Sequence, residues 1–563
     1  MRSLYLLLSL KATPLFQFAL CRFRRVGCFH QIIRMEYSFG VILTIFTVAL
    51  CISIFFKFLF NFTFDNHKNK RKKLPPPPEP SPLLIVLKNI LTFLLQYQKN
   101  ACFNLETVLQ DLKKKHGPIF LVRILGARSH IVICSHSLAR QALVEKSTIF
   151  SNRPTPNRPK LHKIISSSNG TTWHLLRRNL SSEMFGASCI RAYSDTRLHV
   201  LGNLVEKVVS QSNQPINVME NLRFSVFSLL VIMCFGDHKL DEDKVKEFES
   251  VQLLLLVRHA WLNLFDFWRG LRKILFGKQL EEFNRARRDQ ENMFLPLIRA
   301  RRMAKQGPNE DDQDQPRAYV DTLFDLQLPD EKRAFTDKEI VSLCGEFLNA
   351  GTDTIAAALE WIMANLVKNP EIQDKLYQEI AGVVGEPPQL LKPSSLKMPY
   401  LKATILEGLR RHPPGHFLLP HWVTEDVELD NYTIPKNASV NFMLAEISRD
   451  PMVWENPMEF QPERFLSTSF AAAHDNELDS PQMLDMIKGN REMKMMPFGA
   501  GRRMCPGSKF SLHHLEYFVA NLVWYFNWKA VDGIGVDLSE KHTFTVVMKN
   551  PLRADIFPRA KSV

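Results

Sequence analysis

Apolar residues recur every three or four positions over most of residues 100–420. This period is typical of amphipathic helices whose apolar face packs on a core. Ile119–Leu125 and His130–Cys134 are instead rich in β-branched and aromatic residues, which predicts strands. Phe544–Met548 and Ala554–Phe557 flank the turn-like KNPLR and predict a small hairpin. We therefore expect a mainly α fold with small β-sheets, and the lack of a repeating period argues against solenoids and propellers.

The N-terminal region contains a candidate membrane span. Residues 39–56 carry no charge, and 18 helical residues would cover roughly 27 Å of a bilayer core of about 30 Å. A buried core helix is the alternative interpretation. Five basic residues at 68–73 follow the span, and the positive-inside rule then places the following chain in the cytosol. We expect a transmembrane anchor over 35–60.

A linker and a globular body follow the anchor. PPPPEPSP at 75–82 predicts a semi-rigid polyproline spacer, with a ligand for a proline-binding module as the alternative. We therefore assign 61–82 to a basic and proline-rich linker and 83–563 to the globular body that follows it.

The first 34 residues are basic and contain no acid, a composition that resembles a transit peptide and would direct the protein to an organelle. Alternatively, Met35 is the working start, and 1–34 are absent from the mature protein. We favour the second interpretation because it leaves a clear charge asymmetry across the anchor.

Composition narrows the function further. The chain has 563 residues, of which 45% are hydrophobic and 23% charged, enough apolar material for a large core. Most of its net charge of +14 lies in 1–34 and 68–73, which argues against a nucleic-acid-binding face. The nine cysteines include no C-x-x-C pair, so a reducing, cytosol-facing compartment is favoured over a disulfide scaffold.

The strongest chemical signal is PFGAGRRMCPG at 497–507, in which five positions fit F-x-x-G-x-R-x-C-x-G. Here the chain resembles the cytochrome P450 haem-thiolate monooxygenases, in particular plant microsomal A-type members. The resemblance implies that Cys505 ligates the iron of haem b, Phe498 shields the sulfur and Arg503 pairs with a propionate. Gly501 and Gly507 would let the backbone pass close to the sulfur and the porphyrin.

Three further motifs match the same family in order. Glu407 and Arg410 fit E-x-x-R, and with Arg464 of PERF they are implied to form a buried structural network. Ala350-Gly351-Thr352-Asp353-Thr354 matches the oxygen-binding helix, where small residues would leave room for O2. Asp353 and Thr354 would relay protons, whereas Ile355 stands where the family usually has a hydroxyl.

Haem propionates have additional candidate donors. Trp173 and Arg177 fit W-x-x-x-R, and the four-residue spacing places both on one helix face. His421 falls where the family usually has Arg or His.

The resemblance implies a single P450-type domain behind an anchor in the endoplasmic reticulum membrane. It would insert one oxygen atom of O2 into a hydrophobic small molecule, with electrons from NADPH through a flavin reductase. Phe417–Leu419 and Thr545–Val547 would line the pocket, and Lys494, Arg502 and Lys509 would dock the reductase. The alternatives are a haem enzyme that rearranges or dehydrates peroxides without O2, and a non-catalytic haem-binding membrane protein.

Overall fold

The computed structural model describes residues 74–75, 105–123, 129–154, 162–212, 214–236, 241–264, 277–306, 316–384, 390–391, 397–466 and 493–559. They belong to a compact unit that spans Lys73–Val563. The predicted extension (1–34), the predicted anchor (35–60) and, apart from Leu74 and Pro75, the predicted linker (61–82) lie outside the described residues.

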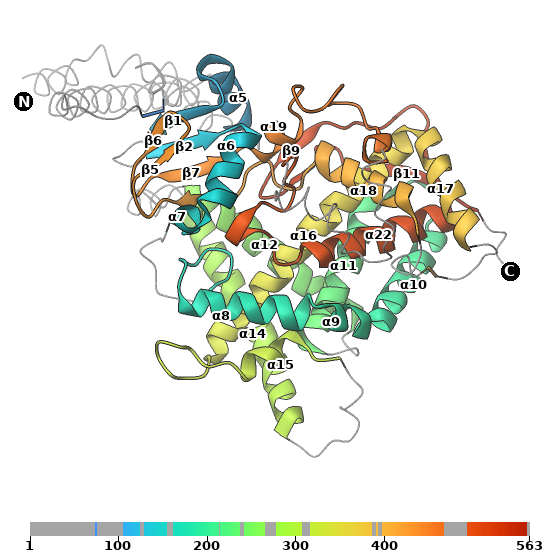
Figure 1. Ribbon diagram of the computed structural model, residues 1–563. Helices are drawn as coiled ribbons and strands as arrows, with labels where there is room; N and C mark the ends of the chain where they lie inside the picture. The colour runs from blue at the N-terminus through green and yellow to red at the C-terminus, as the bar shows by residue number, and fades with distance from the viewer. Residues whose placement is uncertain are drawn as a thin grey trace, which may run out of the picture. The chain divides into compact units, whose positions relative to one another are not determined.

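Helices dominate the described residues (Figure 1). The α-helices are α5 (Leu105–His116), α6 (His136–Arg140), α7 (Ser147–Phe150), α8 (Thr171–Asn179), α9 (Ala187–Ala192), α10 (Ser194–Ser210), α11 (Val218–Phe235), α12 (Glu242–Leu264), α14 (Gly277–Gln306), α15 (Tyr319–Phe324), α16 (Asp337–Lys368), α17 (Pro370–Val384), α18 (Pro399–Arg411), α19 (Leu444–Ser448) and α22 (Ser508–Tyr525). Shorter helical turns are η3 (Gln141–Glu145), η4 (Leu180–Met184), η8 (Pro462–Phe465) and η9 (Gly501–Arg503).

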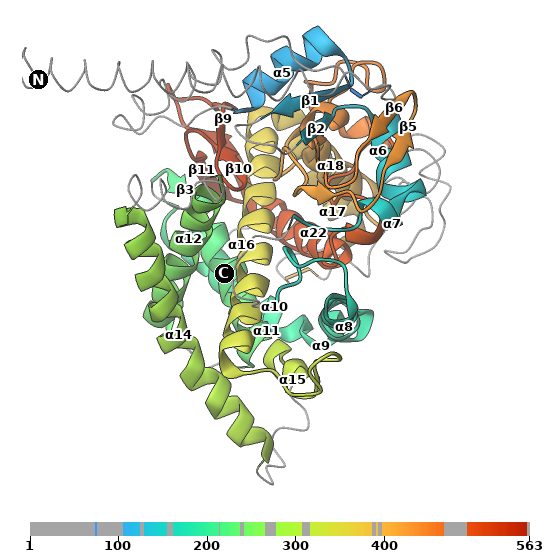
Figure 2. The same ribbon diagram turned by 90° about the vertical axis from the view of Figure 1, so that its left-hand side faces the viewer.

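The long helix α16 is the centre of the fold. It begins at a capping box, in which Glu339 N–H donates to Thr336 Oγ1 (3.4 Å) and Thr336 N–H donates to the Glu339 carboxylate (2.8 Å). Most of its residues are buried. Figure 2 shows α16 with α12 and α14 on one side and α17, α18 and α22 on the other.

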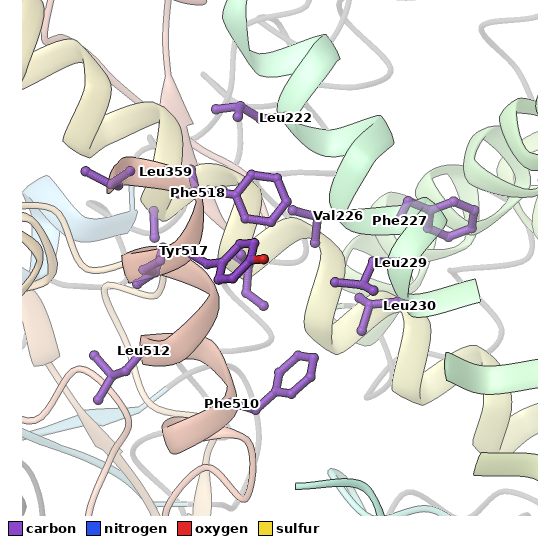
Figure 3. Packing of buried hydrophobic residues seen from close by; sticks show 14 of the residues in the cluster. Leu222, Val226, Phe227, Leu229, Leu230, Leu359, Phe510, Leu512, Tyr517 and Phe518 are labelled. Atoms are coloured by element: carbon purple, nitrogen blue, oxygen red, sulfur yellow. The ribbon is translucent and has the colours of Figure 1, made fainter. Parts of the chain in front are cut away.

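The core joins α16 to its neighbours through large apolar side chains (Figure 3). The side chains of Leu222, Val226 and Leu230 from α11 lie in the same cluster as Phe510 and Phe518 of α22. Residues far apart in the sequence therefore meet around one helix, as expected for a single large core.

The strands of the described residues form four small sheets. The largest has the order β1-β2-β7-β4, with β2 and β7 parallel and the other pairs antiparallel. The other three have the orders β3-β11-β8, β9-β10 and β5-β6. The strands are β1 (Ile119–Arg123), β2 (Ser129–Ile133), β3 (Ile216–Asn217), β4 (His421–Trp422), β5 (Val427–Leu429), β6 (Tyr432–Ile434), β7 (Ser439–Phe442), β8 (Phe526–Ala530), β9 (Glu540–His542), β10 (Val546–Met548) and β11 (Arg553–Pro558).

The expected fold class is confirmed, but the predicted C-terminal hairpin is wrong. Both segments contain strands, yet β10 pairs with β9 and β11 pairs with β8 and β3. The local alternation identified the strands but could not identify their partners, because pairing depends on which upstream strand offers the matching buried face.

Among the described residues, one helix is long and apolar enough to cross a membrane, namely α11. Two observations assign it to the protein core instead: 67% of the helix is buried, and it packs along α16.

Candidate active site

A tight loop presents Cys505 just before α22. The Cys505 N–H donates to Phe498 O (2.8 Å), which closes the loop, and Gly507 directly precedes the helix. The Cys505 side chain is exposed, yet burial is the main cause that raises the pKa of its thiol. Taken together, these two observations indicate a side chain that faces a space enclosed by protein. The Gly507 N–H and Arg177 act in the opposite direction and favour the thiolate.

Of the two motif glycines, Gly501 is required by a contact with another segment, whereas a side chain at Gly507 would meet only an ordinary van der Waals contact. Gly501 has φ +67°, and a Cβ there would lie 1.7 Å from the Leu143 carbonyl oxygen of η3. A Cβ on Gly507 would touch the Phe185 ring at 3.4 Å. Glycine at 501 therefore lets the loop dock on η3, a reason different from the expected approach to sulfur and porphyrin.

Three arginines gather beside this loop, and two of them lie against the Trp173 ring. The Arg503 guanidinium lies 4.0 Å above the Trp173 ring and that of Arg177 lies 5.5 Å from it. Arg177 donates to the Met504 carbonyl, next to Cys505. The third, Arg153, is only 8% exposed and donates to the Leu419 and Pro420 carbonyls at 2.7 and 2.9 Å.

The same three residues, hereafter the arginine cluster (Arg153, Arg177 and Arg503), lack an acidic partner within the described part of the chain. Arg503 donates to the backbone carbonyls of Ser151 (2.6 Å) and Ser167 (2.8 Å), and the Arg153 side chain donates to the carbonyls of Ile165, Leu419 and Pro420. Burial and the neighbouring arginines lower the pKa of Arg503 to about 9 and that of Arg153 to about 10. Buried cations without an anion are costly, so this cluster is built to receive one.

His421 lies at the edge of the cluster. Its Nδ1 is 2.7 Å from the Phe150 carbonyl, and burial, together with Arg153 and Arg503, lowers its pKa to about 3. His421 is therefore neutral at pH 7, and its Nδ1–H donates to Phe150 rather than to a ligand.

The helix α16 exposes one narrow stripe to its surroundings. Between 341 and 367 its residues are buried except at Ser342, Glu346, 349–351 and Thr354, which recur about every four positions. Glu346 accepts hydrogen bonds from the N–H groups of Ile164 and Ile165 (2.7 and 3.0 Å). Because Trp173 Nε1 donates to Ile164 O (3.0 Å), this stripe connects to the arginine cluster through segment 164–165.

Asp353 and Thr354 have separate partners. Thr354 Oγ1 donates to Ala350 O (2.7 Å), so its oxygen can still accept a hydrogen bond. Asp353 is buried and forms an ion pair with Arg223 of α11. The Arg223 guanidinium also lies 3.9 Å from the Glu249 carboxylate. A Cβ on Gly351 would lie 2.7 Å from Leu230 Cδ1, so this glycine allows close packing of α11 on α16.

Glu407, Arg410 and Arg464 form one buried network. Arg410 donates to both Glu407 oxygens (2.7 and 2.8 Å), and both side chains are 0% exposed. Arg464 Nε lies 3.3 Å from the same carboxylate. Arg410 also donates to the Ser448 and Pro457 carbonyls (3.2 and 2.9 Å), and this joins α18 to α19 and to the loop that precedes η8.

Comparison with known proteins identifies the family. The family model for cytochrome P450 matches residues 75–556. The chain belongs to the cytochrome P450 family.

The relatives are plant P450 enzymes. The chain is 42% identical to cytochrome P450 89A9 of Arabidopsis thaliana, over 82% of this chain and 91% of that protein. It is 31% identical to geraniol 8-hydroxylase of Swertia mussotii (80% and 89% covered) and 28% identical to flavonoid 3'-monooxygenase of Arabidopsis thaliana (80% and 87%). A zebra fish cytochrome P450 solved with progesterone shares the fold, with a TM-score of 0.66 at 20% identity over 81% of this chain and 100% of that one.

Membership fixes the reaction class. This P450 is a haem-thiolate monooxygenase that uses haem b, O2, a small-molecule substrate and NADPH-derived electrons supplied by a redox partner. Two of the relatives are named as a hydroxylase and a monooxygenase, and no support arises for the peroxide-rearranging or the non-catalytic alternative.

Sequence reasoning missed two charged residues of the P450 site. Arg153 lies in SNRP, where nothing local distinguishes it from a surface arginine. Arg223 did leave a signal, because it is the one basic residue in the apolar helix α11. A lone cation in a buried helix requires a buried anion, and Asp353 provides it.

We predict that Glu407→Gln destabilises this P450 by about 3–5 kcal/mol, because Arg410 would keep its buried charge without a carboxylate. The measurement is urea unfolding followed by circular dichroism. Glu463→Gln is the matched control, because Glu463 pairs with Lys375 at 2.9 Å on the surface, and its unfolding midpoint should barely move. Equal shifts in the two variants would contradict a structural role for the Glu407 network.

Proposed function

We propose that residues 39–56 anchor this P450 in the endoplasmic reticulum membrane, with the catalytic domain in the cytosol. The uncharged span and the basic residues at 68–73 support this orientation. We further propose that a membrane-bound, NADPH-dependent flavin reductase is the redox partner. Arg502 is exposed on η9, and Lys494 and Lys509 flank the Cys505 loop in the sequence, as expected for a positive docking face.

The single observation that carries the assignment of the haem site is the arginine cluster. Haem b has two propionate groups, and carboxylates are the partners that buried guanidinium groups require. We propose that Arg153, Arg177 and Arg503 hold the propionates, with Trp173 supporting the two arginines on its face. His421 then has a packing role, because its Nδ1–H is used by Phe150.

Cys505 is proposed as the thiolate ligand of the iron. A thiolate favours cleavage of the O–O bond by donating electron density, and binding to the metal would deprotonate the thiol that burial keeps protonated. Phe498 would cover the sulfur, Gly501 would let the loop dock on η3, and Gly507 would supply its N–H to the sulfur.

The α16 residues are proposed to act on protons and on the space for O2. Bound haem supplies the iron at which O2 is reduced. Ala350 and Gly351 keep the adjacent helix surface small, and Thr354 Oγ1 can accept a hydrogen bond from water while donating to Ala350 O. Asp353, held by Arg223, would pass protons from the solvent side to that water.

The substrate is proposed to be a largely apolar small molecule that becomes hydroxylated while the second oxygen atom of O2 leaves as water. The names of the relatives include a geraniol hydroxylase and flavonoid hydroxylases. Phe417–Leu419 and Thr545–Val547 are the proposed pocket walls and are largely apolar.

The thiolate assignment is tested by Cys505→His. The reduced carbon monoxide complex of this variant should lose its strongly red-shifted Soret band, because the histidine ligand is neutral. Cys189→Ser, at another partly buried cysteine, should retain the band. Retention of the band in Cys505→His would exclude Cys505 as the ligand.

The orientation in the membrane is tested at two exposed sequons, Asn431 and Asn437. A cytosolic domain should carry no glycan at either site, as measured by peptide mass spectrometry after glycosidase treatment. A fusion to a cleavable signal peptide that forces the domain into the lumen is the control and should glycosylate both. Glycans at these sites in the native protein would reverse the proposed topology.

The proton role of Thr354 is tested by Thr354→Ala. Loss of a positioned proton donor typically slows the step it serves by about 10²–10⁴-fold, so product per NADPH should fall and hydrogen peroxide per NADPH should rise. The loss of coupling between NADPH consumption and product should be large, because the Ile355 side chain has no hydroxyl that could replace that of Thr354.

Thr352→Ala is the matched control for Thr354→Ala. Thr352 Oγ1 makes the same bond to a carbonyl four residues earlier (Leu348 O, 2.7 Å) but is buried. It should leave the coupling of NADPH to product unchanged. Unchanged coupling in Thr354→Ala would show that protons arrive by another route.

A further inference from the structure

A second group of titratable side chains lies away from the Cys505 loop. Glu106 in the first turn of α5, His416 in the segment after α18 and His542 at the end of β9 meet at one point. Glu106 Oε2 is 2.6 Å from His416 Nδ1 and 3.1 Å from His542 Nδ1. The candidate ligand atoms all lie within 4.8 Å of one another. We refer to these three residues as the Glu106 cluster.

The Glu106 cluster buries a carboxylate that no lysine or arginine of the described residues pairs with directly. Glu106 is 5% exposed and His416 is 2% exposed. Within the described ranges, the ion pairs of Glu106 are with the two imidazoles alone. Arg449 lies 3.4 Å from His416 Nε2, and its guanidinium pairs with Glu540 at 2.5 Å. A buried carboxylate facing two imidazoles has the charge and the donor atoms that a divalent cation requires.

We propose that Glu106, His416 and His542 bind Zn²⁺. Two imidazole nitrogens and one carboxylate oxygen form a donor set that zinc adopts in proteins, with water at the fourth position. Zinc–ligand bonds of about 2.0–2.1 Å in a tetrahedron place the ligand atoms roughly 3.3 Å apart. The Glu106–His542 distance of 3.1 Å is already close to that value, and the Glu106–His416 distance of 2.6 Å requires a small outward movement.

The surroundings of His416 include a carboxylate that could support a zinc-bound histidine. Glu540 Oε1 lies 3.7 Å from His416 Nε2, on the ring atom that does not face Glu106, and Arg449 Nη2 lies 3.4 Å from the same nitrogen. Glu540 would have to move closer to His416 Nε2 to form the hydrogen bond by which a carboxylate orients a metal-binding histidine. His542 is only half-buried, which gives the metal and its water a route from solvent.

Zinc would link three separate segments of the domain. The backbone of His416 accepts hydrogen bonds from Leu444 (2.8 Å) and Ala445 (3.3 Å), and the Val546 N–H of β10 donates to Pro414 O (2.8 Å). The metal would therefore hold the β9-β10 hairpin against the segment that leads into Phe417–Leu419. These are the two proposed walls of the substrate pocket, so zinc would restrain their separation.

The test uses the full-length, haem-loaded protein in detergent after treatment with EDTA and dialysis. Titration of Zn²⁺ against a chromophoric zinc chelator should show one equivalent bound per chain. His542→Gln and Glu106→Gln should each weaken binding by more than the roughly 10–100-fold typical for loss of an outer-shell partner. Zinc should also slow amide hydrogen exchange over 540–548 in the wild type but not in His542→Gln.

His136→Gln is the matched control, because His136 lies 3.8 Å from a single carboxylate, that of Asp450, and it should bind zinc as the wild type does. Absence of a zinc equivalent in the wild type would overturn the proposal. So would a zinc affinity of His542→Gln and Glu106→Gln that equals that of the wild type. If neither variant retains haem, X-ray absorption of the zinc-loaded wild type decides, since imidazole and oxygen ligands are expected and sulfur ligands would overturn it.

Discussion

The constraint on which the site depends is that three partly or fully buried guanidinium groups have no carboxylate beside them among the described residues. Arg153, Arg177 and Arg503 come from different segments, yet all three donate to backbone carbonyls, and Arg177 and Arg503 also meet at the Trp173 ring. Burial lowers the pKa of Arg503 and of Arg153, and the like charges of the neighbouring arginines lower both pKa values further. The fold tolerates this cost because each arginine donates to backbone carbonyls of neighbouring segments, and because an anion can complete the cluster.

The P450 fold uses buried charge in two different ways. In the Glu407 network the charges are compensated within the protein, since Arg410 and Arg464 share one carboxylate. That network fixes α18 to the segments that follow it. The arginine cluster has no acidic partner among the described residues, which is the reason for proposing that it receives an anionic ligand. Guanidinium–carboxylate pairing thus stabilises the fold in the Glu407 network, and it is proposed to bind the ligand in the arginine cluster.

The sequence predicted what depends on local pattern. The central helix containing Ala350–Thr354, the Cys505 loop and the first two strands could all be recognised from residues close together in the chain. The structure brings Arg177 and Arg503 together at Trp173, as the resemblance implied, and also Glu407, Arg410 and Arg464.

What escaped prediction depends on contacts between distant segments. The partner of β11 is β8 rather than β10, and the reason for glycine at 501 is the carbonyl of Leu143. Arg153 and the Glu106 cluster have no recognisable spacing, because their members come from different elements. His421 occupies the expected position, but its available N–H is used by Phe150, which only the structure could reveal.

The most direct test of the account is reconstitution of the apoprotein with haem b and with its dimethyl ester, in which both propionates are neutral. Hydrogen bonds to charged groups contribute about 1.5–3 kcal/mol each. If the arginine cluster binds the propionates, the ester should therefore bind roughly 10²–10⁴-fold more weakly than haem b. In Arg153→Gln, the difference in affinity between haem b and its ester should be smaller than in the wild type. Equal affinity for the two haems would contradict the claim that these arginines are the anion-binding part of the site.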